Sequence, residues 1–326
     1  MDRRTFVSRL VPGAVFAPAL LRARSISAAE PLKVGVFPVG AALPYFVALR
    51  RGYFAQEGLA CETVVMGTPA LIVQALVTGA IDATSNLVTL EGANITARRP
   101  NTLKYTSFVA QNSTHVFEQF VVRPGHPARA LADLRGAKLF TSPGPANIGL
   151  AKAILAKVGL SEGADYQMQE MQLGNHLGAL RSGAFDGGYT LEPVATSLIQ
   201  QGAARRLEAG VIATYIIGNR AAEAYAAGAA VSTGLLKARP EAASRFARAW
   251  SRALADVASD DGVRGYLVSD MNVPPDIVKD VPLSYFVEVK KMTDHQVRDF
   301  QAFVDFGMSI GVVGGKVDVR TLMEPV

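Results

Sequence analysis

Two segments of eight residues are similar in sequence. They lie at positions 75–82 (ALVTGAID) and 179–186 (ALRSGAFD), an offset of 104 positions. In each copy an apolar Ala-Leu pair precedes a glycine, Gly79 or Gly183, which is typical of a helix end that needs a left-handed residue. The alanine after the glycine then begins a short strand. Two matching helix-to-strand joints predict a chain built from two similar α/β halves.

A small polar pair follows each of the two predicted strands. Ser85 and Asn86 follow the first strand, and Tyr189 and Thr190 follow the second. In open α/β sheets, ligands bind at the carboxyl ends of the strands. We therefore expect both pairs to contact a ligand that lies between the two halves.

The length and composition allow two buried cores. The chain has 326 residues, of which 49% are hydrophobic and 19% are charged, and this is ample for two lobes. The formal net charge is +5, but residues 1–29 contain five arginines and one aspartate and so carry +4 of it. The rest of the chain is close to neutral and has no cluster of lysine and arginine, which argues against a nucleic-acid partner.

The N-terminus resembles a twin-arginine signal peptide. Arg3 and Arg4 precede a modest apolar run at 10–21, and small residues up to Ala29 suit cleavage by signal peptidase. The apolar run is too short to span a bilayer and contains two prolines. We expect residues 1–29 to be removed on export by the twin-arginine route, which leaves a soluble periplasmic protein.

Cysteine and histidine usage predicts no metal or catalytic site. Cys61 is the single cysteine, which excludes an intramolecular disulfide and any multi-cysteine metal site. The four histidines are scattered without metal-ligand spacing. The sequence also lacks the motifs of serine hydrolases, zinc proteases, P-loop NTPases and dinucleotide-binding enzymes. We therefore predict a protein that is not an enzyme, with no catalytic residue, no metal and no cofactor.

Strands and helices alternate along most of the chain. The predicted strands lie near residues 33–37, 59–66, 81–84, 103–111, 138–141 and 166–171. The predicted helices lie between them, near 42–58, 69–79 and 147–158, and the chain from 240 onward is helical. Regular alternation of this kind predicts mainly parallel sheets flanked by helices.

Two segments are predicted to connect the halves and to form a hinge, one at 112–123 and the other near 212–219. The first lobe would then comprise residues 30–112 together with about 220–326, which adds the C-terminal helices. The second lobe would comprise about 113–219.

Four short motifs occur in an order and spacing that resemble one protein family. They are Gly52-Tyr53-Phe54-x-x-Glu57-Gly58-Leu59, Gly67-Thr68-Pro69-Ala70, Gly79-Ala80-Ile81-Asp82 and Leu191-Glu192-Pro193. Over residues 32 to about 200, the chain resembles the solute-binding proteins of ABC importers for sulfonates, nitrate and thiamine precursors, the NMT1/THI5-like family. This group shares ancestry with the yeast pyrimidine-precursor synthases.

The resemblance implies a two-lobed type II periplasmic-binding fold that closes on a small molecule. The expected ligand is a small organic solute, such as a sulfonate, an aromatic carboxylate or a pyrimidine-like compound, and the expected partner is an ABC permease served by a monomer. One alternative is a ligand-sensing module for a receptor. Another is an enzyme like the pyrimidine-precursor synthases, but these need a cysteine-rich motif and this chain has only Cys61.

Three predicted helix N-termini would face the crevice between the lobes. Free backbone N–H groups and positive dipole ends at such places favour an anionic or strongly accepting ligand. No arginine lies in the strand-end loops, so bidentate recognition of a carboxylate or sulfonate is not predicted. The three N-termini follow Gly67-Thr68, Ser142-Pro143-Gly144 and Thr190-Leu191.

Candidate ligand-binding residues come from these loops. Phe37 and Tyr45 are candidates for an aromatic wall, and neutral polar side chains either orient a ligand or cap a helix. Glu192 has two interpretations, since it either accepts a hydrogen bond from the ligand or stabilises the first turn of the helix that follows. The predicted ligand-binding residues are Phe37, Val39, Tyr45, Gly67, Thr68, Ser85, Asn86, Thr89, Asn112, Ser142, Asn147, Tyr189, Thr190 and Glu192.

Overall fold

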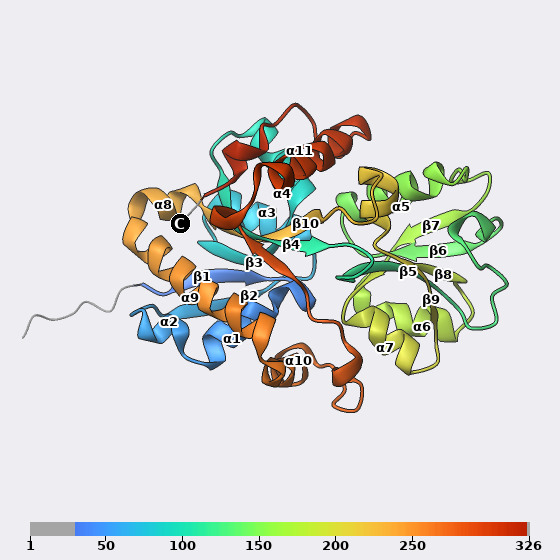
Figure 1. The fold of residues 1–326 in the computed structure, drawn as a ribbon, viewed down its shortest axis with the longest axis horizontal. Coiled ribbons are helices and arrows are strands. Elements are labelled where there is room, and N and C mark those ends of the chain that lie inside the picture. The colour runs from blue at the N-terminus through green and yellow to red at the C-terminus, as the bar shows by residue number, and fades with distance from the viewer. Residues whose placement is uncertain (1–29, 325–326) are drawn as a thin grey trace, which may run out of the picture. The chain divides into compact units, whose positions relative to one another are not determined.

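The computed structural model describes residues 30–324, so the predicted signal peptide at 1–29 lies outside the described residues. Residues 31–324 belong to one compact unit. Two β-sheets organise this unit, and helices cover the faces of each sheet (Figure 1). We name the parts of the chain around the six-stranded sheet the first lobe, and those around the five-stranded sheet the second lobe.

The sheet of the first lobe is mixed. Its strands are β1 (Leu32–Val36), β2 (Cys61–Val65), β3 (Ala83–Val88), β4 (Leu103–Gln111), β10 (Ala224–Ser232) and β11 (Phe286–Glu288). They lie in the order β11-β4-β10-β3-β1-β2. β1 pairs in parallel with β2 and β3, whereas β10 runs antiparallel to β3 and β4, and β11 runs antiparallel to β4.

The sheet of the second lobe is built in the same way. Its strands are β5 (Glu118–Val122), β6 (Lys138–Thr141), β7 (Gln167–Glu170), β8 (Gly187–Leu191) and β9 (Arg205–Ala209). Their order, β7-β6-β8-β5-β9, repeats the order β2-β1-β3-β10-β4 of the first lobe. β6 pairs in parallel with β7 and β8, and β5 runs antiparallel to β8 and β9.

The two similar segments, 75–82 and 179–186, occupy equivalent places in the two lobes. Gly79 and Gly183 have the same left-handed φ of 73°. The aspartates that end each copy also play the same part, since Asp82 Oδ2 accepts the Lys33 N–H at 2.9 Å and Asp186 Oδ2 accepts the Lys138 N–H at 2.8 Å. Each aspartate thus ties the start of β3 or β8 to the start of the neighbouring strand β1 or β6, and the predicted repeat is confirmed.

The predicted two-lobed α/β fold is confirmed, but the sheets are mixed where the sequence suggests mainly parallel ones. Each sheet contains a strand that follows a crossing from the other lobe, β5 or β10, and this strand runs antiparallel to both of its neighbours. Alternation along the chain describes consecutive segments and carries no signal for a strand inserted from elsewhere.

Helices cover both faces of the first-lobe sheet (Figure 1). Buried aromatic side chains such as Tyr45 and Trp250 fill one face, and Phe300 lies in the core of the other. The helices of the first lobe are α1 (Leu43–Arg50), α2 (Tyr53–Gln56), α3 (Pro69–Thr78), α4 (Thr89–Arg98), α8 (Thr233–Ala238), α9 (Pro240–Ser259), α10 (Arg264–Met271) and α11 (Asp294–Ser309). Those of the second lobe are α5 (Pro145–Lys157), α6 (His176–Arg181) and α7 (Val194–Gln200).

The two connections between the lobes pass in close contact. The first runs from β4 to β5 through Asn112 and Ser113, and the second leaves β9 through Gly210 and the π-helical segment Ile212–Ile217. Gly210 has a left-handed φ of 67°, and a β-carbon on it would lie 2.3 Å from the backbone nitrogen of Ser113. Only glycine fits at this crossing.

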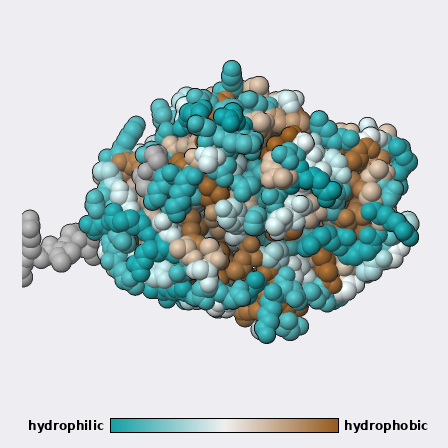
Figure 2. Space-filling view, viewed as in Figure 1, coloured by the Kyte–Doolittle hydropathy of each residue, from teal (hydrophilic) through white to brown (hydrophobic). Residues whose placement is uncertain are grey.

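The surface in Figure 2 is mostly hydrophilic, with hydrophobic residues scattered over it. Within residues 30–324, the exposed large hydrophobic side chains are Val65, Leu71, Tyr285 and Met308. In this part of the chain no helix combines the length and apolar character needed to cross a membrane. Most other apolar side chains of these residues lie in three buried clusters.

Candidate functional site

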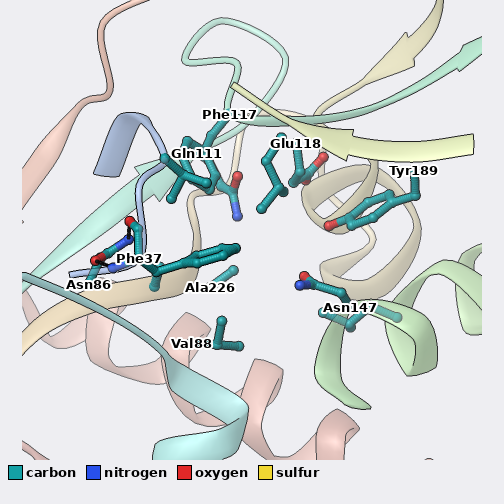
Figure 3. A pocket seen from close by; sticks show the side chains of 13 residues that line it. Phe37, Asn86, Val88, Gln111, Phe117, Glu118, Asn147, Tyr189 and Ala226 are labelled. Carbon is teal, nitrogen blue, oxygen red and sulfur yellow. Dashed lines mark hydrogen bonds between the residues drawn. The ribbon is translucent and has the colours of Figure 1, made fainter. Parts of the chain in front are cut away.

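A small cavity lies between the two lobes (Figure 3). Both sheets contribute to its wall, through β3, β4, β10 and the segment after β1 in the first lobe, and through β5, β8 and α5 in the second. Neither lobe encloses the space alone. The lining residues are Phe37, Val39, Asn86, Val88, Gln111, Phe117, Glu118, Asn147, Leu150, Tyr189, Leu191, Ala226 and Ala227.

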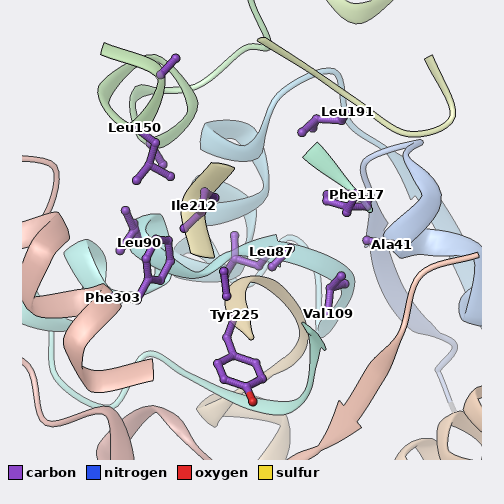
Figure 4. Close-up of a cluster of buried hydrophobic side chains, with 14 of the residues drawn as sticks. Ala41, Leu87, Leu90, Val109, Phe117, Leu150, Leu191, Ile212, Tyr225 and Phe303 are labelled. Carbon is purple, nitrogen blue, oxygen red and sulfur yellow. The ribbon is translucent and has the colours of Figure 1, made fainter. Parts of the chain in front are cut away.

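Most of the cavity wall is apolar. Phe117 and Leu191 are buried, and they belong to a hydrophobic cluster that includes side chains of both lobes. Figure 4 shows Leu87 and Val109 of the first lobe in the same cluster as Leu150 of the second. An apolar ligand surface placed here is removed from water, which favours binding.

Two further contacts join the lobes beside the cavity. The N–H of Gly40 donates a hydrogen bond to the carbonyl oxygen of Glu192 at 2.9 Å. Glu91 of α4 lies against the start of α5, and its Oε1 is 2.7 Å from the place that a β-carbon on Gly144 would occupy. The lobes therefore meet in this structure.

The Asn86 side chain lines the cavity, but its amide is engaged within the first lobe. Its Nδ2 donates to the carbonyl oxygen of Phe37 at 2.8 Å, and its Oδ1 accepts the Phe37 N–H at 3.2 Å. The Ser85 hydroxyl also lies 2.6 Å from this Oδ1. Asn86 thus extends the pairing of β1 with β3 and holds Phe37 in the cavity wall.

Asn86→Ala should lower the stability of the unliganded protein. The substitution leaves the buried N–H and carbonyl of Phe37 unpaired, which costs roughly 1 to 3 kcal/mol of unfolding free energy. Urea denaturation measures this loss. Asn175→Ala is the matched control, because Asn175 is exposed and its side chain caps no helix. An equal loss at both positions would show that the hydrogen bonds of Asn86 to the Phe37 backbone contribute nothing to stability.

Glu118 is the carboxyl group of the cavity wall. It opens β5 and is only 1% exposed. Its Oε1 accepts the Ile212 N–H at 3.2 Å, while its Oε2 has no hydrogen-bond partner in the protein. Burial raises the pKa of Glu118 to about 8, against the opposing effect of the N–H groups of Ile212 and Val211. At neutral pH this carboxyl is therefore largely protonated.

Gln111, Asn147 and Tyr189 add further polar groups to the wall. Gln111 ends β4, is 1% exposed, and has no partner for its Oε1. Asn147 Nδ2 donates to the carbonyl oxygen of Pro143 at 2.7 Å. Burial, together with the nearby Glu118, raises the pKa of Tyr189 well above its usual value, and Figure 3 shows its hydroxyl directed into the cavity.

Strand alternation divides the two polar pairs that the sequence predicts to contact a ligand. Asn86 of β3 and Tyr189 of β8 line the cavity, whereas their neighbours Ser85 and Thr190 do not. Successive side chains of a strand point to opposite faces of the sheet. One residue of each predicted pair therefore lies at the cavity and the other in the fold behind it.

Thr190 takes part in a buried contact on the far face of β8. Its Oγ1 lies 3.0 Å from Nδ1 of His176, and the imidazole stacks on Phe140 with ring centroids 4.1 Å apart. Burial lowers the pKa of His176 to about 4. This histidine is therefore neutral at physiological pH and packs as part of the second-lobe core.

Thr89 and Ser142 are also used within the fold, away from the lining. The Thr89 hydroxyl donates to the carbonyl oxygen of Tyr225 at 2.6 Å and so links α4 to β10. The Ser142 hydroxyl donates to the carbonyl oxygen of Tyr189 at 3.3 Å. Both side chains are fully buried.

Asn112 and Tyr45 likewise have structural partners. Asn112 Oδ1 accepts the N–H groups of Thr114 and His115, each at 2.9 Å, and so shapes the first crossing between the lobes. The Tyr45 hydroxyl lies 2.7 Å from Oγ1 of Thr63. Tyr45 belongs to the core between α1 and α9 rather than to the cavity wall.

Two of the helix N-termini predicted to attract an anion are capped by side chains of this chain. At α3, Thr68 Oγ1 accepts the Leu71 N–H at 3.4 Å, while Gly67 is exposed. At α7, Glu192 Oε2 accepts the Thr196 N–H at 3.1 Å. Of the two interpretations of Glu192, the structure shows the helix-capping contact, and none of these residues lines the cavity.

The third predicted N-terminus, that of α5, faces Glu91 of the other lobe. Glu91 is buried, and its oxygens make no well-formed hydrogen bond. Burial raises its pKa to about 7, and the N–H of Ala146 in the first turn of α5 opposes this effect. The carboxyl group of Glu91 thus stands where the sequence suggests a ligand anion.

The sequence candidates omit eight residues of the wall, and the omission has a structural reason. Ala226 and Ala227 lie on the inserted strand β10, whose neighbours alternation along the chain does not reveal. A glutamate that opens the otherwise uncharged β5 is the signal that indicates Glu118. The omitted residues are Val88, Gln111, Phe117, Glu118, Leu150, Leu191, Ala226 and Ala227.

A family model described as NMT1/THI5 like matches residues 41–261 of the chain. A comparison with curated proteins found no match. Across residues 30–324, no group of three or more histidine, cysteine, aspartate or glutamate side chains is placed to hold a metal ion.

Solved structures share the fold over most of their length. The periplasmic aliphatic sulphonate binding protein SsuA from Escherichia coli is 17% identical with a TM-score of 0.71, covering 90% of this chain and 92% of its own. The alkanesulfonate-binding protein SsuA from Xanthomonas axonopodis pv. citri, bound to MOPS, is 20% identical with a TM-score of 0.72, covering 91% and 99%. The periplasmic nitrate-binding protein NrtA from Synechocystis PCC 6803 is 14% identical with a TM-score of 0.68, covering 89% and 84%.

Proposed function

Because this chain belongs to the NMT1/THI5-like family, we propose that it is the solute-binding component of an ABC importer. It binds a small organic solute in the cavity between its lobes and delivers the solute to a membrane permease. The observation that carries the proposal is the shared wall of the cavity, since side chains of both lobes are needed to enclose it. The binding proteins that share its fold support this role.

The family and the sequence of the N-terminus support a location in the periplasm. We propose that residues 1–29 direct export by the twin-arginine route and that the mature protein acts in the periplasm as a monomer. The cavity contributes binding groups, and we propose no catalytic turnover there.

Closure of the lobes is the proposed means of capture. We propose that the hinge lies at the two crossings, which run through or beside the segments predicted from the sequence, 112–123 and about 212–219, and which meet where Gly210 approaches Ser113. The hydrogen bond from Gly40 to Glu192 and the approach of Glu91 to α5 join the lobes beside the cavity. These contacts would form as the lobes close and part as they open.

Protein isolated from the periplasm should carry its solute, and removal of that solute should open the lobes. Native mass spectrometry identifies the retained solute. Small-angle scattering should then give a larger radius of gyration for the solute-free protein than for the same protein saturated again with the recovered compound. An unchanged radius at proven saturation would contradict closure and favour a rigid pocket.

A further inference from the structure

The wall of the cavity is poorly suited to an anion. Its lining residues include no lysine, arginine or histidine, and one of them is Glu118. The helix N-termini that the sequence suggests for an anion face acceptors of this chain, namely Thr68, Glu91 and Glu192. A carboxylate or sulfonate here would enter an apolar space without a positive group to balance its charge.

Two oxygens of the wall are buried, and Gln111 Oε1 accepts hydrogen bonds, whereas Glu118 Oε2 does so once its carboxyl is ionised. Glu118 Oε2 and Gln111 Oε1 have no hydrogen-bond partner, although both side chains are 1% exposed. Buried acceptors without partners are unfavourable and are rare in folded proteins. A ligand group that donates hydrogen bonds to them removes this cost on binding.

We propose that the cavity binds a single-ring organic molecule whose N–H groups donate hydrogen bonds to Glu118, and that it rejects carboxylates and sulfonates. This inference rests on the proposed function, because it names the ligand class of the same cavity. The rings of Phe37, Phe117 and Tyr189 line the space and provide faces for a flat or cationic group. The space is small in this structure, and a ring would enter it as the lobes part.

The ionisation of Glu118 distinguishes a cationic ligand from a neutral one. The groups that face its carboxyl are Tyr189 of β8 and the N–H groups of Val211 and Ile212. Its pKa of about 8 keeps it largely protonated at pH 7. A cation stabilises the carboxylate and so releases a proton on binding, whereas a neutral N–H donor releases none. An anion held by the protonated carboxyl would bind more weakly as the pH rises through this pKa.

Three isosteric probes test the ligand class: benzamidine, which is a cation, benzamide, which is neutral, and benzoate, which is an anion. Calorimetric titration of the solute-free mature protein at pH 7 should show binding of benzamidine and benzamide, with benzoate weaker than benzamidine by roughly tenfold or more. Repeating the benzamidine titration in buffers of different ionisation enthalpy should reveal the released proton.

Glu118→Gln tests whether Glu118 binds the N–H groups of the ligand. The substitution should weaken benzamidine binding by roughly tenfold or more, because it removes the carboxylate, and should change benzamide binding far less. Glu241→Gln is the matched control, since this glutamate on α9 has a side chain that is 69% exposed and should affect neither probe. Thermal melting of each variant confirms that it is folded.

Three results would overturn the ligand class. They are benzoate binding as tightly as benzamidine, an unchanged benzamidine affinity in Glu118→Gln, and failure of all three probes to bind. The proposed function is judged separately, by closure around the solute recovered from the periplasm. If the recovered solute is a carboxylate or sulfonate and closes the lobes, the proposed ligand class is wrong, but the proposed transport function still stands.

Discussion

Gly210→Ala should lower the free energy of unfolding by roughly 3 to 5 kcal/mol. Gly210 has a left-handed φ of 67°, which disfavours any side chain. A β-carbon there would also lie 2.3 Å from the backbone nitrogen of Ser113 and 2.6 Å from the carbonyl carbon of Asn112. Backbone atoms cannot turn aside as a flexible side chain does, so the two crossings must separate.

Gly202→Ala provides the matched control for this prediction. Gly202 has a φ of 65°, nearly that of Gly210, but a β-carbon there would meet no atom within 4 Å. Gly202→Ala should lower the free energy of unfolding by only about 1 to 2 kcal/mol, the cost of placing a side chain at a left-handed φ. Urea denaturation of both variants measures the difference. Equal losses would mean that the contact of Gly210 with Asn112 and Ser113 adds nothing to the loss of unfolding free energy.

Relative to the parent, Glu118→Gln should gain roughly 3 kcal/mol of stability in the solute-free protein between pH 5 and pH 8. The folded pKa of Glu118 is about 8, whereas its ordinary value is 4.5. Between these values the folded protein holds a proton that the unfolded chain has released, so stability falls as the pH rises. Glutamine carries no charge to bury, and the amide donor that it leaves unpaired costs the same at both pH values.

Other buried groups also make stability depend on pH, so the test compares variant with parent. The raised pKa of Glu91, about 7, lowers stability as pH rises in the same sense. The lowered pKa of His176, about 4, acts oppositely and only below its ordinary value of 6.5. Both effects cancel in the difference between the two proteins. A difference in unfolding free energy that stays constant from pH 5 to pH 8 would show that Glu118 is ionised throughout.

Much of the fold could be predicted from local signals because these signals act on the backbone itself. Gly79 and Gly183 mark helix ends through the conformation that glycine permits. Thr68 marks a helix start through its hydroxyl group, which accepts the N–H of Leu71. The inserted strands β5 and β10 could not be placed, because their neighbours come from distant parts of the chain.

The cavity wall was predicted only in part for the same reason. Phe37, Val39, Asn86, Asn147 and Tyr189 are candidates from the sequence that do line the cavity. Strand ends identify the region, but the face that a residue presents depends on where each strand begins. β3 starts at Ala83 and continues to Val88, beyond the predicted strand, so the pair Ser85 and Asn86 lies within it. Whether the lining residues contact a ligand stays a prediction.

The position of β10 has a consequence for the order in which the molecule can be made. The five-stranded sheet uses a continuous stretch of chain, 118–209, whereas the six-stranded sheet lacks the strand between β3 and β4 until Ala224–Ser232 have been synthesised. On the ribosome the second lobe can therefore complete its sheet first, while β1 to β4 wait with an open edge. The second lobe, which lies in the middle of the sequence, can therefore fold before the first lobe, whose sheet is complete only when most of the chain has been translated.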